Sequence, residues 1–144
     1  MGRYLVVAHQ TADSPQLRDR LQEMARVDLS AEFTLLVPAT PAGNLLIWEE
    51  GEAIDIARRQ ANAARQALEA AGIKVGNASI GDQNPLLAIQ DELRSHPGYT
   101  AVVISTLPAR ASRWLKMDLV SRAQRQFPHV DVGHVIAKAK TPAR

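Results

Sequence analysis

Short apolar runs alternate along the chain with longer amphipathic stretches, which is the pattern of repeated β-α units. Tyr4–Ala8, Phe33–Val37 and the centre of Tyr99–Ser105 are continuously apolar, as in strands covered on both faces of a parallel sheet. Lys74–Ile80 is short and polar, which suits a sheet edge, and Val130–Ile136 supplies a fifth strand. The pattern predicts one α/β domain with a five-stranded, mostly parallel sheet and four covering helices.

The helical stretches carry recognisable start and stop signals. Ser14-Pro15 and Asn84-Pro85 each place a capping side chain before a proline at the first helical position. A long helix is expected from about Glu52–Ala71, ended by Gly72, and a last helix from about Asp118. The apolar positions expected to face the sheet are Leu17, Leu21 and Met24; Ile54, Ala57, Ala61, Ala64, Leu68 and Ala71; Leu86, Ile89 and Leu93; and Leu119, Ala123 and Phe127.

Length and composition narrow the class of protein. A chain of 144 residues matches a single domain, which we place at 1–137, followed by a basic C-terminal tail at 138–144. The chain has no cysteine, so disulfide frameworks, thiol nucleophiles and Cys-ligated metal sites are excluded. The apolar run at the N-terminus is too short for a signal peptide or membrane span, so we expect a cytoplasmic protein without membrane contact.

Charge is balanced overall, with 17 Lys plus Arg against 15 Asp plus Glu, but the last quarter is basic. Two interpretations stay open: a solvated helix face with a loose tail, or an anion site for phosphate. Binding of nucleic acid is not expected, because no interleaved aromatic residues or known motif accompany the charge.

Ligands of open parallel sheets bind at the carboxyl ends of the strands, where the strand order reverses. A stretch ahead of the last helix, residues 109–117, completes this edge and places basic residues near a helix N-terminus, a natural anion site. The candidate binding residues are Ala8, His9 and Gln10 after the first strand, Val37 on the second, Ser105 and Thr106 on the fourth, and Arg110, Ser112, Arg113 and Asp118 beyond it.

Two segments resemble the universal stress protein family of adenine-nucleotide-binding α/β domains. They are Gly81–Pro85, which leads into the third helix, and Ala101–Ser105 followed by Asp118–Arg122. The resemblance covers nearly the full chain. It implies a Rossmann-like, three-layer α/β/α domain with strand order 3-2-1-4-5, and a homodimer formed through the last strand, Val130–Ile136.

The ATP-binding members of that family carry a glycine-rich stretch after the fourth strand. Here Ser105–Asp118 contains no glycine, so the backbone is not expected to approach a phosphate closely. We also expect the Asp118 carboxylate to cap the last helix or to pair with Arg113, and His9-Gln10 stands where the family usually has an aspartate. No cofactor is therefore expected, although ATP or AMP stays possible through Arg110, Arg113 and Lys116.

Catalytic and metal sites find little support. The histidines lack metal-ligand spacing and are expected at the surface or at strand ends, and no nucleophile elbow or Walker loop is present. Trp114 is expected to pack against a partner or loop rather than to stack on a base. The resemblance to universal stress proteins implies a non-enzymatic stress-response or regulatory domain. The alternative is a nucleotide- or small-anion-binding sensor, or a nucleotide hydrolase, that uses the carboxyl edge.

Overall fold

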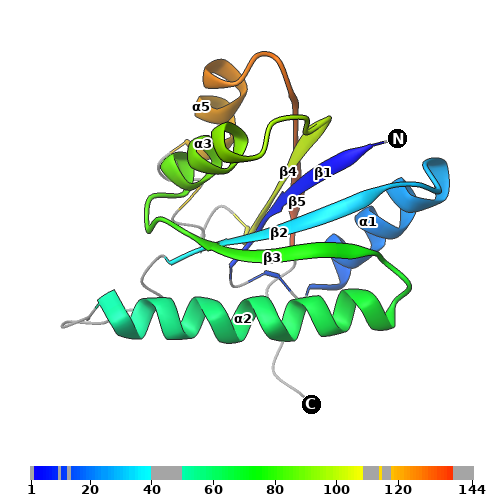
Figure 1. Ribbon diagram of the computed structural model, residues 1–144, viewed down its shortest axis with the longest axis horizontal. Helices are drawn as coiled ribbons and strands as arrows, with labels where there is room; N and C mark the ends of the chain where they lie inside the picture. Colours follow the sequence, from blue (N-terminus) through cyan, green and yellow to red (C-terminus); the bar gives the residue numbers. More distant parts are fainter. Residues whose placement is uncertain are drawn as a thin grey trace.

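The computed structural model describes residues 2–9, 11–12, 14–39, 50–108, 114 and 118–137. Its strands and helices alternate along the chain as the sequence pattern predicts (Figure 1). The elements are β1 (Arg3–Val7), α1 (Pro15–Val27), β2 (Glu32–Pro38), α2 (Glu50–Ala70), β3 (Val75–Gly81), α3 (Pro85–Ser95), β4 (Ala101–Thr106), α5 (Leu119–Gln126) and β5 (Asp131–Ile136).

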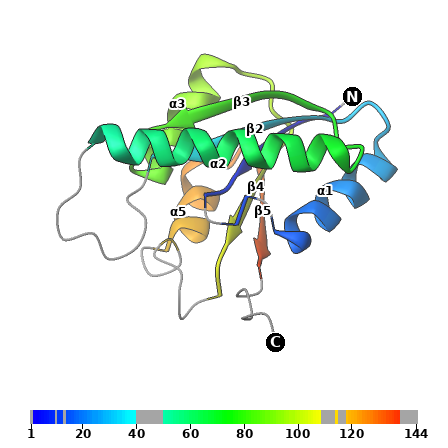
Figure 2. The same ribbon diagram turned by 90° about the horizontal axis from the view of Figure 1, so that it is seen from below.

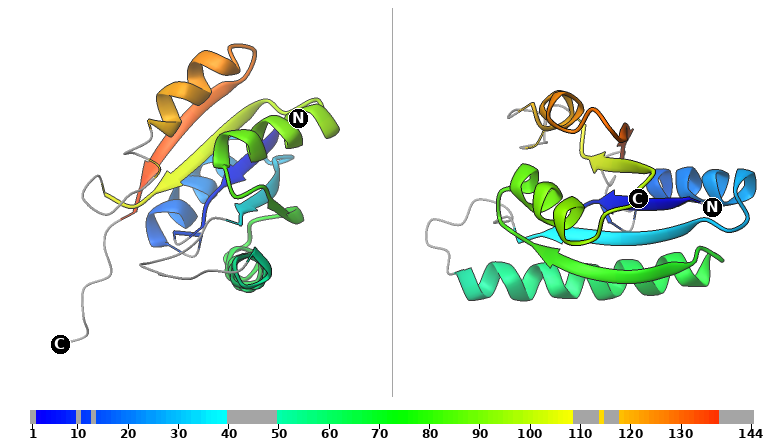
Figure 3. Two further views of the ribbon diagram at one scale, coloured as in Figure 1. Left: turned by 90° about the vertical axis from the view of Figure 1, so that its left-hand side faces the viewer. Right: turned by 45° about the horizontal axis from the view of Figure 1, so that its top comes forward.

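The five strands form one sheet in the order β3-β2-β1-β4-β5, and every neighbouring pair is parallel. This confirms the predicted three-layer, Rossmann-like fold and its strand order. Helices α1 and α2 cover one face of the sheet, and α3 and α5 cover the other (Figures 1 and 3). The chain winds in opposite directions from β1 and from β4, so a crevice is expected between the carboxyl ends of these two strands.

Two apolar cores fill the spaces between the sheet and its helices. The first lies under α1 and α2, where the small side chains of Ala57, Ala61 and Ala64 are buried. These small side chains let α2 pack closely on the sheet, and Figure 2 shows the long α2 ribbon running along it. The second lies under α3 and α5 and is built around Ile89, Ile104 and other fully buried side chains. Full burial of an isoleucine side chain such as Ile89 or Ile104 stabilises the fold by roughly 1.5–3 kcal/mol.

Local signals position the helices as the sequence indicates. The Ser14 side chain accepts a hydrogen bond from the Leu17 amide, and the Asn84 side chain accepts one from the Leu86 amide. Gly72 follows α2 with a φ of 83°, a left-handed conformation that glycine adopts without strain. The predicted boundaries differ from the observed ones by one or two residues, as at the start of α2.

At the amino-terminal edge of the sheet, a buried carboxylate joins α3 to the segment before β4. The Tyr99 hydroxyl donates to Glu92 at 2.7 Å, and His96 Nδ1 lies 3.0 Å from the same oxygen. Burial raises the pKa of Tyr99 to about 12, and the hydrogen bond to Glu92 adds to this shift. The Arg3 guanidinium lies 4.9 Å from the Tyr99 ring centroid. This cluster is structural, because it lies at the end of the sheet opposite the crevice.

Among the described residues, no helix combines the length and apolar character needed to cross a lipid bilayer. The longest helix, α2, carries charged side chains along its exposed positions.

Candidate functional site at the carboxyl edge

The carboxyl ends of β1 and β4 are neighbours, which brings together two groups of predicted site residues that lie far apart in the sequence. Val7 pairs with Ile104, so the residues that follow β1 lie beside the last residues of β4. The predicted residues at this edge are deeply buried: Ala8 and Val37 are fully inaccessible, and Ser105 and Thr106 are nearly so. The structure therefore places Ala8, His9, Val37, Ser105 and Thr106 at the end of the sheet where the sequence predicts them.

The crevice between β1 and β4 is bridged by two hydroxyl groups. Thr11 Oγ1 lies 2.6 Å from Ser105 Oγ, and both side chains are buried. Thr11 is held by the turn that leads from β1 into α1, in which the amide of Ala12 donates to the carbonyl of His9 and the amide of Ser14 donates to that of Thr11. One of these hydroxyls donates the hydrogen bond and the other accepts it, at the position where ligands of this class of fold bind.

A second side-chain hydrogen bond lies one strand further along the same edge and joins a hydroxyl to an imidazole. Thr106 Oγ1 is 2.7 Å from His134 Nε2, and the amide of Ala137 donates to the Thr106 carbonyl. Burial lowers the pKa of His134, so its ring is neutral at pH 7 and can accept the hydroxyl proton. The end of β4 is thereby tied to both β1 and β5 by side chains.

His9 differs from the polar residues around it. It directly follows β1 and is only 6% exposed, and its Nε2 atom is buried without a hydrogen-bond partner in the described part of the chain. Burial lowers the pKa of His9, so the imidazole is uncharged at pH 7. The expectation of a histidine at the end of a strand is confirmed, but the alternative of a surface residue is wrong for His9, because the fold covers it.

Asp118 lies at the start of α5, as predicted, but it does not cap the helix. Its backbone is in the left-handed region, with a φ of 57°, and its side chain makes no hydrogen bond to the helix amides. The capping expectation is therefore wrong. The carboxylate lies 3.8 Å from the Arg125 guanidinium, and both side chains are more than half exposed, so the pair contributes little to stability.

Several predicted residues lie outside the described part of the chain: Gln10, Arg110, Ser112 and Arg113, together with Lys116. The expected pairing of Arg113 with Asp118 is thus still a prediction. Trp114 is described, and it packs in the core beneath α3 and α5 with 7% of its surface exposed. This contact with the chain's own core replaces the expected packing against a partner or loop.

Two residues outside the predicted set of binding residues complete the edge, although Thr11 directly extends the predicted stretch Ala8–Gln10 after the first strand. Thr11 and His134 form the two side-chain bridges, and neither belongs to a recognisable motif. The described residues contain no group of three or more His, Cys, Asp and Glu side chains that could hold a metal ion. Chemically, the described edge offers hydroxyls already paired and two neutral imidazoles, of which His134 is paired with Thr106 and His9 has an unpartnered Nε2 among the described residues.

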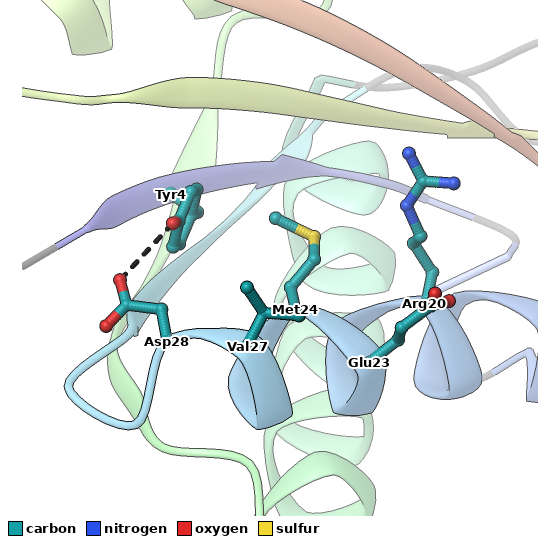
Figure 4. A pocket seen from close by; sticks show the side chains of 6 residues that line it. All are labelled: Tyr4, Arg20, Glu23, Met24, Val27 and Asp28. Carbon is teal, nitrogen blue, oxygen red and sulfur yellow. Dashed lines mark hydrogen bonds between the residues drawn. The ribbon is translucent and has the colours of Figure 1, made fainter.

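A groove of about 370 Å³ lies elsewhere, beside α1 (Figure 4). Met24 and Val27 form its apolar wall, and Arg20 extends from α1 toward β5. The Tyr4 hydroxyl donates to Asp28 at 3.3 Å at one end of the groove. Because Tyr4 lies at the start of β1, this groove is at the amino-terminal end of the sheet and is separate from the β1–β4 crevice.

The whole fold is similar to that of solved universal stress proteins. A universal stress protein family member from Burkholderia pseudomallei superimposes with a TM-score of 0.61 at 13% identity, covering 92% of this chain and 94% of that one. A universal stress protein from Archaeoglobus fulgidus in complex with dAMP gives a TM-score of 0.56 at 17% identity, covering 94% and 97%. An Arabidopsis thaliana family protein with AMP bound gives 0.55 at 13% identity, covering 98% and 94%.

These identities are low enough that the likeness shows the fold and not the activity. No protein-family model matches the sequence, and no curated protein matches it. The fold expected from the resemblance is therefore confirmed, whereas the ligand and role of this chain are matters for proposal.

Proposed function

We propose that this chain is a non-enzymatic stress-response or regulatory domain of the universal stress protein type, which does not bind ATP through a glycine-rich loop. The observation that carries the proposal is the likeness of the fold over nearly the full length of this chain and of the solved proteins. A domain in this class can act through binding and association alone, so its function needs no catalytic group.

The departure from ATP binding rests on two features of the carboxyl edge. The sequence has no glycine between Gly98 and Gly133, so the stretch after β4 has no position that favours close approach of the backbone to a triphosphate. In addition, the Thr11–Ser105 hydrogen bond spans the crevice between β1 and β4 and ties its two sides together. We expect both features to disfavour a triphosphate held by backbone amides.

Calorimetric titration with ATP and with AMP, each with and without magnesium, tests this part of the proposal. The expected result is weak or undetectable heat from ATP at protein concentrations of tens of micromolar. Submicromolar affinity for ATP would overturn it.

Association through the last strand is the second part of the proposal. β5 is at the end of the strand order, so one of its edges has no neighbouring strand within the described chain. Of the side chains expected to form the surface, Val135 is buried in the core under α1 and α2, whereas Ile136 is 52% exposed. We therefore place the apolar contact on Ile136 and the outer edge of β5, with Val132 only partly available.

Sedimentation velocity tests this association. The wild-type chain is expected to sediment as a dimer, and Ile136→Asp as a monomer with an unchanged circular dichroism spectrum. Leu29→Asp is the matched control, because Leu29 is 93% exposed and lies in the turn after α1 rather than on β5. A monomeric wild type, or equal loss of association in both variants, would contradict the proposal.

A nucleotide- or small-anion-binding sensor is the second candidate function, and the buried His9 Nε2 atom, which has no hydrogen-bond partner among the described residues, favours it. The solved relatives that carry AMP or dAMP support the same candidate. If Arg110 and Arg113 hold the anion, their double replacement by alanine abolishes AMP and phosphate binding and leaves the dimer intact. Unfolding of that variant would instead indicate that both arginines have structural roles.

A further inference from the structure

Strand β3 forms one end of the sheet, and its outer edge has no neighbouring strand within the described chain (Figure 1). The Ala39 amide donates to the Gly81 carbonyl, so Gly81 directs its backbone groups toward β2. The direction of these groups alternates along a strand, and hence Ala78 and Ile80 direct theirs away from the sheet. Both side chains pack against the core under α1 and α2, which holds this edge in place.

The two halves of β3 differ in how the outer edge is protected. In the first half, Gly76 is an extra residue opposite β2, and the Val75 carbonyl accepts a 3.5 Å hydrogen bond from Arg65 of α2. Bulges, charged side chains and prolines are the usual protection of edge strands. The second half, residues 77–81, pairs regularly with β2 and contains no charged residue or proline. This half is therefore open to pairing with a further strand.

A second copy of β3 suits this edge, because an uncharged strand can face itself without repulsion between like charges. Identical edges related by a two-fold axis pair in the antiparallel direction. If the axis passes beside Ser79, Ala78 of each copy lies opposite Ile80 of the other, and all their outward amides and carbonyls are paired. An axis beside Ala78 or Ile80 would instead bring residues outside the regular half into the pairing.

The same pairing brings the two copies of α2 side by side. Helix α2 packs below both β2 and β3 (Figure 1). With the helix centred below two strands, the two helix axes are separated by two strand spacings, or about 10 Å. This is the upper end of the usual distance between packed helices, so the helices can meet without a clash between their backbones.

The charges on α2 favour this arrangement. The helix runs beside β3 in the opposite direction, and Arg65 reaches Val75 (Figure 1). Ser79 lies about 13 Å further along β3, which corresponds to about nine residues toward the start of the helix. Asp55 and Arg58 occupy that level, and their side chains are more than half exposed. Because Arg58 lies about two turns before Arg65, it is on the same side of α2. Across a two-fold axis there, each Arg58 faces Asp55 of the other copy.

We propose that the chain associates with a second copy through residues 77–81 of β3, in antiparallel register about Ser79 and with the two α2 helices in contact. This interface is separate from β5 and does not depend on the function proposed above. It contains few hydrogen bonds, so its dissociation constant should be on the order of 0.1–1 mM, as for small transient interfaces. At lower concentration only the association through β5 is expected.

Disulfide trapping tests this register, because the chain has no cysteine. In the Ile136→Asp background, Ser79→Cys places two thiols at the axis, where the facing Cα atoms are about 4.5 Å apart. Asn77→Cys is the matched control, because it lies on the same face of β3 and loses the same hydrogen bond between Asn77 and Ser79. Its two copies would lie about 13 Å apart, too far for a disulfide. At millimolar protein we expect disulfide dimers of Ser79→Cys to form roughly tenfold faster or more than those of Asn77→Cys.

Two further changes in the Ser79→Cys chain test the contacts. Ala78→Pro removes an outward amide and keeps the pairing with β2, so the disulfide should form as slowly as in Asn77→Cys. Arg58→Asp sets like charges against each other and should slow the reaction about three- to tenfold, and adding Asp55→Arg should restore it. This restoration excludes unfolding as the cause and decides the matter if Ala78→Pro does not fold.

Equal rates for Ser79→Cys and Asn77→Cys would overturn the interface, as would a rate that Ala78→Pro and Arg58→Asp both leave unchanged. These results do not affect the association through β5, which is removed in this background, or the binding of nucleotides. Failure of the β3 interface is therefore distinguishable from failure of the proposed function.

Discussion

Removal of both hydroxyls of the Thr11–Ser105 pair should destabilise the protein by less than the sum of the two single removals. The two oxygens are 2.6 Å apart, at the short end of hydroxyl hydrogen bonds, and both side chains are less than 5% exposed. Ser105→Ala leaves the Thr11 hydroxyl buried without its partner, and Thr11→Val does the same to Ser105. Each single change should cost about 1–3 kcal/mol, because the desolvated hydroxyl is no longer satisfied.

The double variant Thr11→Val, Ser105→Ala leaves no hydroxyl behind, so its cost should fall well below the sum of the two single changes. We expect a coupling energy of roughly 1 kcal/mol or more in a double-mutant cycle. Urea denaturation of all four proteins measures it, and each kcal/mol should also move the melting temperature by about 4 °C in a domain of this size.

Ser79→Ala provides the control for this cycle. The Ser79 hydroxyl accepts a 3.0 Å hydrogen bond from Asn77 on the exposed part of edge strand β3, so its loss should change stability by less than about 0.5 kcal/mol. Additive effects at Thr11 and Ser105, or single variants as mild as Ser79→Ala, would refute the idea that this pair bridges the crevice.

Three further predictions follow from the buried polar groups and from the end of α2. Tyr99→Phe removes the hydrogen bond to the buried Glu92 carboxylate and should cost about 1.5–3 kcal/mol in urea denaturation, whereas a wild-type midpoint would contradict the buried contact. Burial lowers the pKa of both His9 and His134 below the value of 6.5 that they have in the unfolded chain. Below about pH 6.5 the unfolded chain therefore binds more protons than the folded one, and the free energy of unfolding should fall. Equal urea midpoints at pH 7.5 and 5.5 would contradict this. Gly72→Ala places a side chain at a φ of 83° and should lower stability by about 1–2 kcal/mol through strain alone, since the added methyl has open space; thermal denaturation measures it, and an unchanged midpoint would contradict it.

Much of the fold was predictable because its signals are local. Continuous apolar runs such as Tyr4–Ala8 indicate strands that are covered on both faces. The pairs Ser14-Pro15 and Asn84-Pro85 indicate where helices begin, and the structure confirms both helix starts. The alanine stripe of α2 likewise reports close packing on the sheet.

The site was only partly predictable because its contacts are not local. Thr11 and Ser105 are 94 residues apart, and although the strand pattern places Ser105 at the carboxyl edge, nothing in the sequence indicates that the two hydroxyls pair. At Asp118 a sequence signal was present but the contact it predicts did not form. An acidic residue before a helix is a good capping signal, but the left-handed backbone of Asp118 leaves its side chain without a hydrogen bond to the helix amides. The burial of His9 also depends on how the fold covers the end of β1.

A crystal structure grown with magnesium and ATP tests the central claim most directly, namely that this copy of the fold has no glycine-loop triphosphate site. The account predicts that the Thr11–Ser105 hydrogen bond persists and that no triphosphate lies against the backbone of residues 105–118. A triphosphate held there by main-chain amides, with the Thr11–Ser105 bond broken to admit it, would contradict the account.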